Sequence, residues 1–358
     1  MKITLGADPE VFLYSLEKQK FISSIGKIGG SKTEPKNLGN GFALQEDNVT
    51  VEYNIPPCKT PEEFVQANLY MKGRLDQIAD HYNCVIKVVP SAVFDEAELD
   101  TEAAWIFGCD PDLNAWTLEE NPPPKSENIY LRSAGGHIHF GVKDLDKKQK
   151  ISIVRLLDLI FGTQLAILEP QNDRKLLYGM PGAWRDKPYG LEWRTPSNYW
   201  LTDSKLMNEV GYQTQNLIGN VLNGWDTSTL PSYNYKDLTA IFNDSKLPLE
   251  LEKWCLKNHL ILNEYEKKIL KANTKAATKS ANKNPSVPEY ISTFADFIPF
   301  DRNQETNAQA NQRLENDRAR IDAIRNAMAD RNLQVRSIPP DGIDPNAQFV
   351  FELTRTTS

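Results

Sequence analysis

The chain has 358 residues, of which 40% are hydrophobic, so it can bury one large core or two ordinary ones without disulfide bridges. Its formal net charge of −7 argues against a general binder of nucleic acids or anionic membranes. No stretch approaches the roughly 20 apolar residues of a spanning helix, and the opening MKITLGADPE looks like a strand rather than a secretion signal. We therefore expect a cytoplasmic protein that binds neither nucleic acid nor membrane.

The four cysteines stand singly in the sequence: Cys58, Cys84, Cys109 and Cys255. This spacing offers neither a disulfide framework nor a zinc motif, and it fits reduced thiols in the cytosol. Small buried hydrophobic side chains are the simplest interpretation.

Short extended segments open the chain. Residues 3–5 and 11–14 read as two strands around the sequence Gly-Ala-Asp-Pro-Glu, and this first pair looks antiparallel. Residues 49–55 alternate apolar and polar side chains, so one face of that strand is apolar and the other carries Glu52 and Asn54.

Helices interrupt these strands without a regular alternation. Residues 61–82 follow a helix-start signature and place apolar side chains at helical spacing, and residues 146–168 do the same. Two strands are predicted between the helices, over residues 85–89 and 138–142. The order indicates an α+β fold rather than a doubly wound sheet.

The last third of the chain contains a break in composition. Residues 203–222 and 248–272 read as two scaffold helices. Residues 271–287 are mostly Lys, Asn, Ala, Thr and Ser, which is typical of a mobile loop or linker. We therefore predict a first domain over residues 1–270 and a C-terminal extension over residues 288–358.

The extension is predicted to be mainly helical. Residues 303–332 form a charged helix with a thin apolar stripe, and residues 348–353 form a last strand.

The strand at 138–142 brings two of the four histidines together. In the sequence of residues 133–141, Ser-Ala-Gly-Gly-His-Ile-His-Phe-Gly, the period of two places His137 and His139 on one face. Two imidazoles then point into one space, which indicates metal or substrate binding. An isolated His-x-His is more often structural, so the interpretation depends on neighbouring motifs.

Carboxylates occur in two further segments. Asp8 and Glu10 share a face of an extended segment, which suits hard divalent cations such as Mg²⁺. Glu46 and Asp47 precede the strand that carries Glu52, and a charged group on a largely apolar strand needs a partner or a metal. Solvated acidic pairs are common, so neither segment is decisive alone.

A fourth segment, residues 178–198, combines acidic and basic side chains. Glu192 and Arg194 share a strand face, and Arg185 and Lys187 stand in the loop before it. A cation on the glutamate could bridge phosphate oxygens while the basic groups neutralise charge on a transferred phosphoryl group. A structural salt-bridge cluster is an equal alternative.

Together these segments resemble the glutamine-synthetase and glutamate–cysteine-ligase superfamily, and most closely the phage-type carboxylate–amine ligases. Four motifs carry the resemblance in order: Gly-x-Asp/Glu-x-Glu, Glu…Glu, Gly-x-His-x-His and Gly-x-Glu-x-Arg, all between residues 6 and 198. The turn at residues 107–112 is similar to one in phage-type members. The resemblance implies a glutamine-synthetase-like curved antiparallel sheet, a partial barrel with helices on its outer face, and a host cytoplasm if a phage encodes the chain.

The resemblance also implies cofactors and their ligands. The concave face would hold two or three Mg²⁺ ions, with Mn²⁺ as an alternative, beneath ATP. The positions that match metal ligands are Asp8, Glu10, Glu46, Glu52, His137 and Glu192. Asp8 stands where the family usually has glutamate, and the short spacing to Glu52 could shift the role of Glu46 to Asp47.

The nucleotide side is implied in the same way. His139 resembles the histidine that faces nucleotide or substrate, and Arg194 resembles the arginine that meets the phosphates. Gly190 stands where glutamine synthetase has another arginine, so Arg185 or Lys187 would reach in from the loop. Asp47 and Glu46 are candidates for the general base.

The implied activity is ATP-dependent amide formation through an acyl phosphate. Substrates would be small-molecule or peptide carboxylates and amines, or a protein side chain or terminus, and an oligomer is compatible with the sequence. Two alternatives stay open. A metal-dependent hydrolase would use the histidines and acids to activate water, and a non-catalytic phage structural or binding protein would keep the fold without the activity.

Overall fold

The computed structural model describes residues 2–105, 112–122, 126–170, 173–244, 246–271, 333–335 and 353–355. The chain divides into two compact units, Met1–Ala276 and Ala277–Ser358. In the second unit the described residues are two antiparallel strands, β14 (Leu333–Val335) and β15 (Leu353–Arg355).

Several predicted elements fall largely or wholly outside the residues that the structure describes. The linker predicted at residues 271–287, apart from Lys271, and the charged helix predicted at 303–332 lie outside the described residues. The strand predicted at 348–353 meets β15 only at Leu353.

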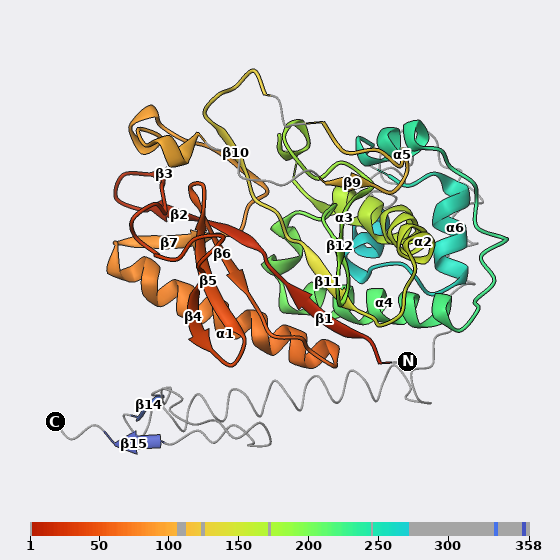
Figure 1. Ribbon diagram of the computed structural model, residues 1–358, viewed down its shortest axis with the longest axis horizontal. Coiled ribbons are helices and arrows are strands. Elements are labelled where there is room, and N and C mark those ends of the chain that lie inside the picture. The colour runs from red at the N-terminus through yellow and green to blue at the C-terminus, as the bar shows by residue number, and fades with distance from the viewer. Residues whose placement is uncertain are drawn as a thin grey trace, which may run out of the picture. The chain divides into compact units, whose positions relative to one another are not determined.

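Two antiparallel sheets form the centre of the first unit (Figure 1). The first sheet holds, in order, β1 (Thr4–Ala7), β11 (Ile138–Gly141), β13 (Gly190–Trp193), β12 (Ala183–Lys187) and β9 (Leu113–Asn114). The second holds β3 (Lys20–Ile22), β2 (Glu10–Ser15), β6 (Thr50–Asn54), β5 (Phe42–Asp47) and β4 (Lys36–Gly39), with β7 (Cys84–Lys87) also paired to β2. A separate pair joins β8 (Ser91–Val93) to β10 (Leu131–Ser133).

The chain passes from the first sheet to the second at Asp8 and Pro9, and we call this crossing, residues 7–10, the seam. β1 pairs with β11, whereas β2 pairs with β6, so the antiparallel pair predicted from the first two strands is wrong. Backbone hydrogen bonds join the seam to residues 135–137 on one side and to residues 53–55 on the other. The two sheets therefore act as one curved surface.

Helices cover the outer side of this surface. The first is α1 (Pro61–His81), which starts at Thr60, whose side chain accepts a hydrogen bond from the N–H of Glu63. It packs against α4 (Ser204–Leu222) and β1. The predicted helices at 61–82 and 203–222 and the α+β class are confirmed.

A second helical run packs on β12 and β13. It starts at a capping box between Asp146 and Gln149 and consists of α2 (Lys147–Leu157), a π-helical turn (Asp158–Gly162) and α3 (Thr163–Leu168). Among the described residues it is the one helix long and apolar enough to cross a membrane, so the expectation that no stretch approaches this length is wrong. Most of its apolar window is buried inside the protein, as in a core helix.

The later helices depart from the prediction. The helix predicted at 248–272 is split into α6 (Leu249–Lys257) and a helix over residues 263–271, because the chain turns at His259, whose φ is +57°. A further helix, α5 (Tyr235–Phe242), begins at Asn234 after the turn-rich stretch. Short 3-10 helices lie at Glu96–Glu98, Glu102–Ala104, Arg174–Leu176 and Asn198–Thr202.

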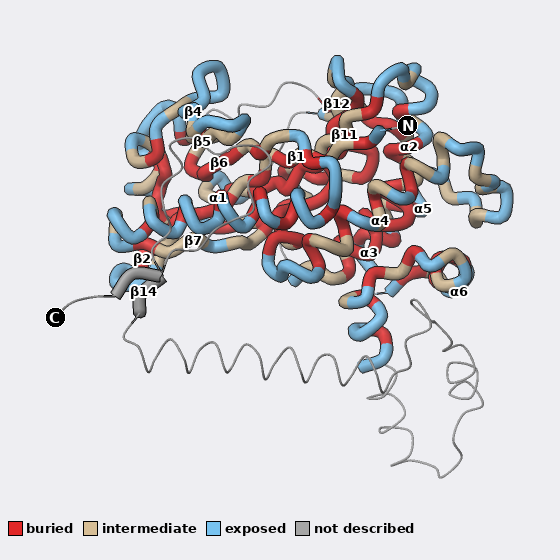
Figure 2. Tube along the Cα trace, turned by 90° about the horizontal axis from the view of Figure 1, so that it is seen from below, coloured by how far each residue is buried: buried red, intermediate tan, exposed pale blue. Residues whose placement is uncertain are grey.

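One large core lies between the helices and the strands, as the buried segments in Figure 2 show. β11 and β13 contribute Ile138, Phe140, Leu191 and Trp193 to it. Because strand side chains alternate, the residues between them face the other side of the sheet. Among the described cysteines, Cys58, Cys84 and Cys255 are buried free thiols, as predicted, and Cys109 lies outside the described residues.

A substitution at Phe64 tests how α1 packs against the rest of the first unit. Its ring is fully buried and stacks on Trp200 at 5.3 Å between centroids. We expect Phe64→Ala to lower the free energy of unfolding by about 3–5 kcal/mol, because it leaves a cavity. Urea denaturation measures this, with Leu69→Ala, on the same helix and 39% exposed, as the control. Equal losses for the two variants would contradict the packing.

Candidate functional site

A row of polar side chains crosses three neighbouring strands of the first sheet. His139 on β11 lies opposite Glu192 on β13, which lies opposite Arg185 on β12. Residues directly opposed in an antiparallel pair point to the same face, here the face away from the core. His137, Arg194 and Lys187 stand two residues along these strands and share that face.

A second row lies on the other sheet. Glu10 on β2 is opposite Glu52 on β6, and Glu52 is opposite Gln45 on β5. Asp47, two residues after Gln45, therefore faces the same way. The side-chain amide of Gln45 donates to Glu52 Oε2 at 2.8 Å and holds that carboxylate in place.

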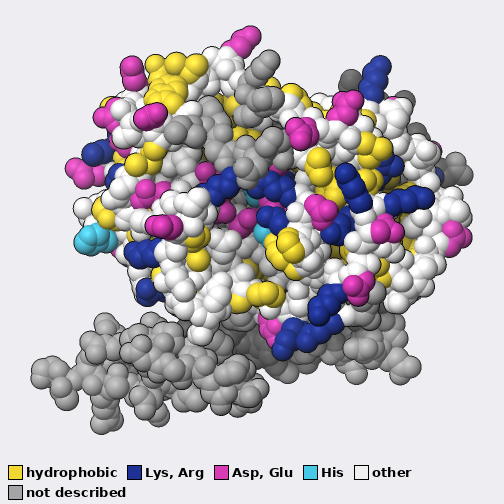
Figure 3. Space-filling model, viewed as in Figure 1, with side chains coloured by type: hydrophobic (Ala, Val, Ile, Leu, Met, Phe, Trp, Pro, Cys, Tyr) yellow, Lys and Arg dark blue, Asp and Glu magenta, His cyan; other side chains and the backbone are white. Residues whose placement is uncertain are grey.

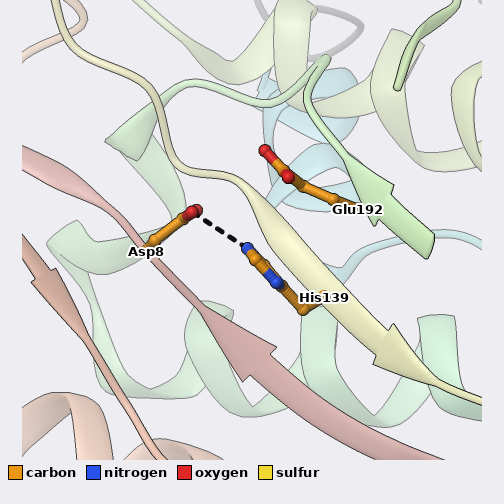
Figure 4. A group of neighbouring side chains, drawn as sticks. All are labelled: Asp8, His139 and Glu192. Carbon is orange, nitrogen blue, oxygen red and sulfur yellow. Dashed lines mark ion pairs between the residues drawn. The ribbon is translucent and has the colours of Figure 1, made fainter. Parts of the chain in front are cut away.

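The seam brings the two rows together. Asp8, His139 and Glu192 each offer a ligand atom, and these atoms lie within 4.8 Å of one another. Figure 4 shows the three side chains pointing into one space, with His139 Nε2 at 3.0 Å from Asp8 Oδ2. We call these three residues the first ligand group.

The second ligand group is Glu10, Asp47 and Glu52, whose carboxylate oxygens also lie within 4.8 Å of one another. Glu10 is fixed by the backbone N–H of Gly135, which donates to its Oε2 at 2.8 Å. The two groups are neighbours because Asp8 and Glu10 are two residues apart on the seam.

The second group concentrates three carboxyl groups in a half-buried place. Burial and the repulsion of Asp47 raise the pKa of Glu10 to about 7. Burial, together with the repulsion of Asp8 and Glu10, raises the pKa of Glu52 well above its usual value, and burial raises the pKa of Asp47. A cation at this position would offset the repulsion.

The first group has the opposite electrostatics. Burial would raise the pKa of Asp8, but the charge of His139, 3.0 Å away, and the nearby His137 hold it well below its usual range. Burial and Asp8 would raise the pKa of Glu192, but Arg194 and the histidines lower it to about 2. Both carboxylates are therefore ionised at neutral pH.

Basic side chains surround Glu192, which is fully buried. Lys187 Nζ lies 2.7 Å from its Oε2, Arg185 Nη1 lies 3.8 Å from its Oε1, and Arg194 donates to Oε1. Asp112 holds both arginines from the other side, with its Oδ1 at 2.7 Å from Arg194 Nε and 3.3 Å from Arg185 Nε. Both guanidinium groups thus lie between the carboxylates of Glu192 and Asp112.

The two histidines have different surroundings. His137 was expected as a metal ligand and His139 at the nucleotide, but the structure places His139 in the first ligand group. His137 lies beside it, where its Nδ1 is 3.1 Å from Arg194 Nη1 and 3.4 Å from Asp8 Oδ1. Its ring folds over Gly135, where a Cβ would come within 2.4 Å of Nε2.

The structure corrects the assignment of Glu46. Its carboxylate accepts the backbone N–H groups of Gly26, Ile28 and Gly29 at 2.8–3.0 Å and so anchors that loop. On β5, Glu46 is directly opposite Val51, one residue out of register with the pair that holds Glu52. A shift of one residue turns a side chain to the other face of the sheet. Asp47, rather than Glu46, therefore shares the face of Glu52.

Arg185 and Lys187 also differ from the expectation. They stand on β12 rather than in a loop, so the sheet fixes their direction. Tyr189, in the tight turn between β12 and β13, had no predicted role. Its hydroxyl lies 2.5 Å from His139 Nδ1, and its ring stacks on the imidazole while remaining 46% exposed.

The sequence indicated Asp112 only as the end of a turn, and residues 107–111 of that turn lie outside the described residues. An Asp-Pro-Asp sequence was the one available signal. The link of Asp112 to two arginines arises from contacts distant in sequence.

A pocket adjoins the second ligand group, and Figure 3 shows acidic, basic and His side chains gathered near the middle of this face. Its wall includes Arg174, whose guanidinium donates to the carbonyls of Ala134, Thr195 and Pro196. The lining residues are Glu10, Asp47, Asn48, Thr50, Arg132, Ser133, Gly135, His137, Arg174, Tyr178 and Arg194.

The donor set fits a hard divalent cation. Carboxylate oxygens with one imidazole are ligands that suit Mg²⁺ and Mn²⁺. Among the described residues, Asp8 Oδ1 and Glu192 Oε2 are buried and accept no hydrogen bond of good geometry, although Asp8 Oδ1 lies 3.4 Å from His137 Nδ1 and Glu192 Oε2 lies 2.7 Å from Lys187 Nζ. A metal ion could take the place of these imperfect contacts.

A comparison with known protein families matches the part of the chain that contains the histidines and arginines of the site. Residues 126–221 match the family described as phage phiEco32-like COOH.NH2 ligase-type 2. This segment contains both histidines and the strands β12 and β13, so the predicted resemblance to the phage-type ligases is confirmed over these residues. Asp8, Glu10 and the acids of β5 and β6 lie outside the match.

One similar solved structure is described as "GmaS/ADP complex-Conformation 1". It is 13% identical in sequence, and the similarity covers 81% of this chain and 72% of that chain with a TM-score of 0.36. No curated protein matches the sequence.

The raised pKa of Glu10 predicts that cation binding depends on pH. Below its pKa of about 7 the carboxyl is protonated and must lose its proton to bind a cation. We expect the Kd for Mn²⁺ to fall as pH rises from about 6 to about 8, by up to about tenfold per unit for one released proton.

Calorimetry in buffers of different ionisation enthalpy measures both the Kd and the proton release. Glu62→Gln, on the exposed start of α1, is the control and should keep the wild-type profile. A Kd that stays constant over this range would exclude Glu10 from the ligands.

Proposed function

We propose that the protein is an ATP- and Mg²⁺-dependent carboxylate–amine ligase that forms an amide through an acyl phosphate. The observation that carries the proposal is the meeting of two ligand groups at the seam, with Arg185, Lys187 and Arg194 beside one of them. The match of residues 126–221 to a carboxylate–amine ligase family supports the same reaction class.

The two ligand groups would hold the cations. The first group would hold one ion and the second group another, and such ions neutralise phosphate charge and align the reactants. The buried carboxylates of the second group repel one another, which gives the cation a clear energetic role.

The basic side chains would bind the phosphates of ATP. Arg194 and Arg185 are both held by Asp112, so their forks are oriented before a ligand arrives. Lys187 adds a compact charge on the same face. Preorganised cations of this kind stabilise the charge that moves to the leaving group when the phosphoryl group is transferred.

The proposed reaction has two steps. A substrate carboxylate oxygen attacks the γ-phosphorus, and the bond to the β-phosphate oxygen breaks, which gives an acyl phosphate and ADP. An amine nitrogen then attacks the acyl carbon, loses a proton and displaces inorganic phosphate. We assign the proton to Asp47, which lines the pocket and would accept it on the carboxylate oxygen that does not bind the cation.

The substrate and partner proposals follow from this chemistry. The carboxylate and amine would belong to small molecules, peptides, or a side chain or terminus of a protein. A cytoplasmic setting would supply the ATP and Mg²⁺.

Titration of ATP into the protein by calorimetry, with and without Mg²⁺, tests the proposal. We expect binding that requires Mg²⁺ and, with suitable carboxylate and amine pairs, release of ADP. Binding in neither condition would overturn the ligase assignment. Hydrolysis of an ester or amide without nucleotide would instead identify a metal-dependent hydrolase.

Substitution of one residue in each ligand group tests the proposed site directly. Glu192→Gln and Glu52→Gln each remove one charge from a different ligand group, so we expect either change to lower ATP turnover by at least about 100-fold while the chain stays folded. Glu252→Gln is the matched control, because Glu252 is buried on α6 and belongs to neither group. Its turnover should remain near wild type, and wild-type turnover in Glu192→Gln would remove that residue from the site.

A further inference from the structure

Asp158 is a buried carboxylate behind the site. It is fully buried, and it stands at the start of the π-helical turn between α2 and α3. In this turn the N–H of Thr163 donates to the carbonyl of Asp158, five residues back rather than four. Insertions of this kind in helices often accompany functional sites.

Four donors converge on this carboxylate. Trp193 Nε1 and Thr195 Oγ1 donate to Oδ1 at 2.8 and 2.6 Å. Trp116 Nε1 and the backbone N–H of Gly182 donate to Oδ2 at 3.0 and 2.6 Å. A buried carboxylate with four hydrogen bonds is fully satisfied and fixes the groups that donate to it.

The donors are the neighbours of site residues. Trp193 and Thr195 alternate with Glu192 and Arg194, so Asp158 holds the back of the segment whose front carries the glutamate and arginine of the site. Gly182 directly precedes β12, which carries Arg185 and Lys187.

The remaining donor connects to Asp112. Trp116 follows Asp112 by four residues. Between these two residues Asn114 holds a turn, because its Oδ1 accepts from the N–H groups of Trp116 and Thr117. The same Asn114 packs against Gly182, where a Cβ would lie 2.3 Å from its Oδ1.

We propose that Asp158 is the positioning residue of the phosphate side of the site, a role that rests on the proposed function. It ties together the three segments that supply Asp112, the basic residues of β12, and the pair Glu192 and Arg194. It touches none of the reacting groups, and it acts through the strands that carry them.

Asp158→Asn tests the proposal because an amide has one acceptor and one donor end. Its oxygen can serve either Trp193 and Thr195 or Trp116 and Gly182, while its NH₂ group faces the other two donors. One of the two attachments is therefore lost with almost no change in volume. Glu252→Gln makes the same chemical change at another buried carboxylate and is the control.

The first readout is hydrogen–deuterium exchange of the ligand-free proteins. In Asp158→Asn we expect faster exchange in residues 112–122 and 179–198, and unchanged exchange in β2, β5 and β6. This measurement needs no ligand, so it decides the positioning role even if the protein binds neither metal nor ATP. Faster exchange throughout the first unit, or no local change, would overturn the proposal.

The second readout is the Kd for Mn²⁺ in the absence of nucleotide. Loss of support behind a ligand typically weakens metal binding by about 10- to 100-fold, and we expect a loss in this range for Asp158→Asn but not for Glu252→Gln. Wild-type affinity in Asp158→Asn, or an equal loss in both variants, would overturn the proposal. A wild-type protein that binds Mn²⁺ but not ATP would contradict the ligase function and leave this comparison valid.

Discussion

The repulsion between half-buried carboxylates at the seam is the interaction on which the rest of the site depends. Asp8 and Glu10 stand where one strand leaves the first sheet and the next enters the second, so each belongs to a different ligand group. Clustered, buried carboxylates are costly without a cation. The basic residues around Glu192 balance one group inside the protein, whereas burial and mutual repulsion raise the pKa values of the carboxyl groups around Glu52.

Much of the site could be predicted from the period of two along strands. That rule paired His137 with His139, Asp8 with Glu10, and Glu192 with Arg194, because the residues of each pair lie on one strand or extended segment. Glu46 was implied by the resemblance instead, with Asp47 as the alternative, and the register of β5 against β6 that decides between them cannot be read from one strand. A register error of one residue exchanges the two faces, which is why Asp47 occupies the site.

The parts that sequence could not supply depend on contacts between distant segments. Nothing local to Asp112 indicates that Arg185 on β12 and Arg194 after β13 meet it, and Asp158 reads as an ordinary residue of an amphipathic helix. Likewise, the apparent hairpin of the first two strands was wrong because β1 pairs with β11, far along the chain, and β2 pairs with β3, β6 and β7. The α+β class was predictable because it follows from the order of strands and helices alone.

Anomalous diffraction from crystals soaked in Mn²⁺ tests the central claim most directly, because it locates cations without reference to any reaction. We expect one anomalous peak among Asp8, His139 and Glu192 and a second among Glu10, Asp47 and Glu52. Peaks elsewhere, or no peak at the seam at saturating Mn²⁺, would show that these carboxylates are arranged for another purpose.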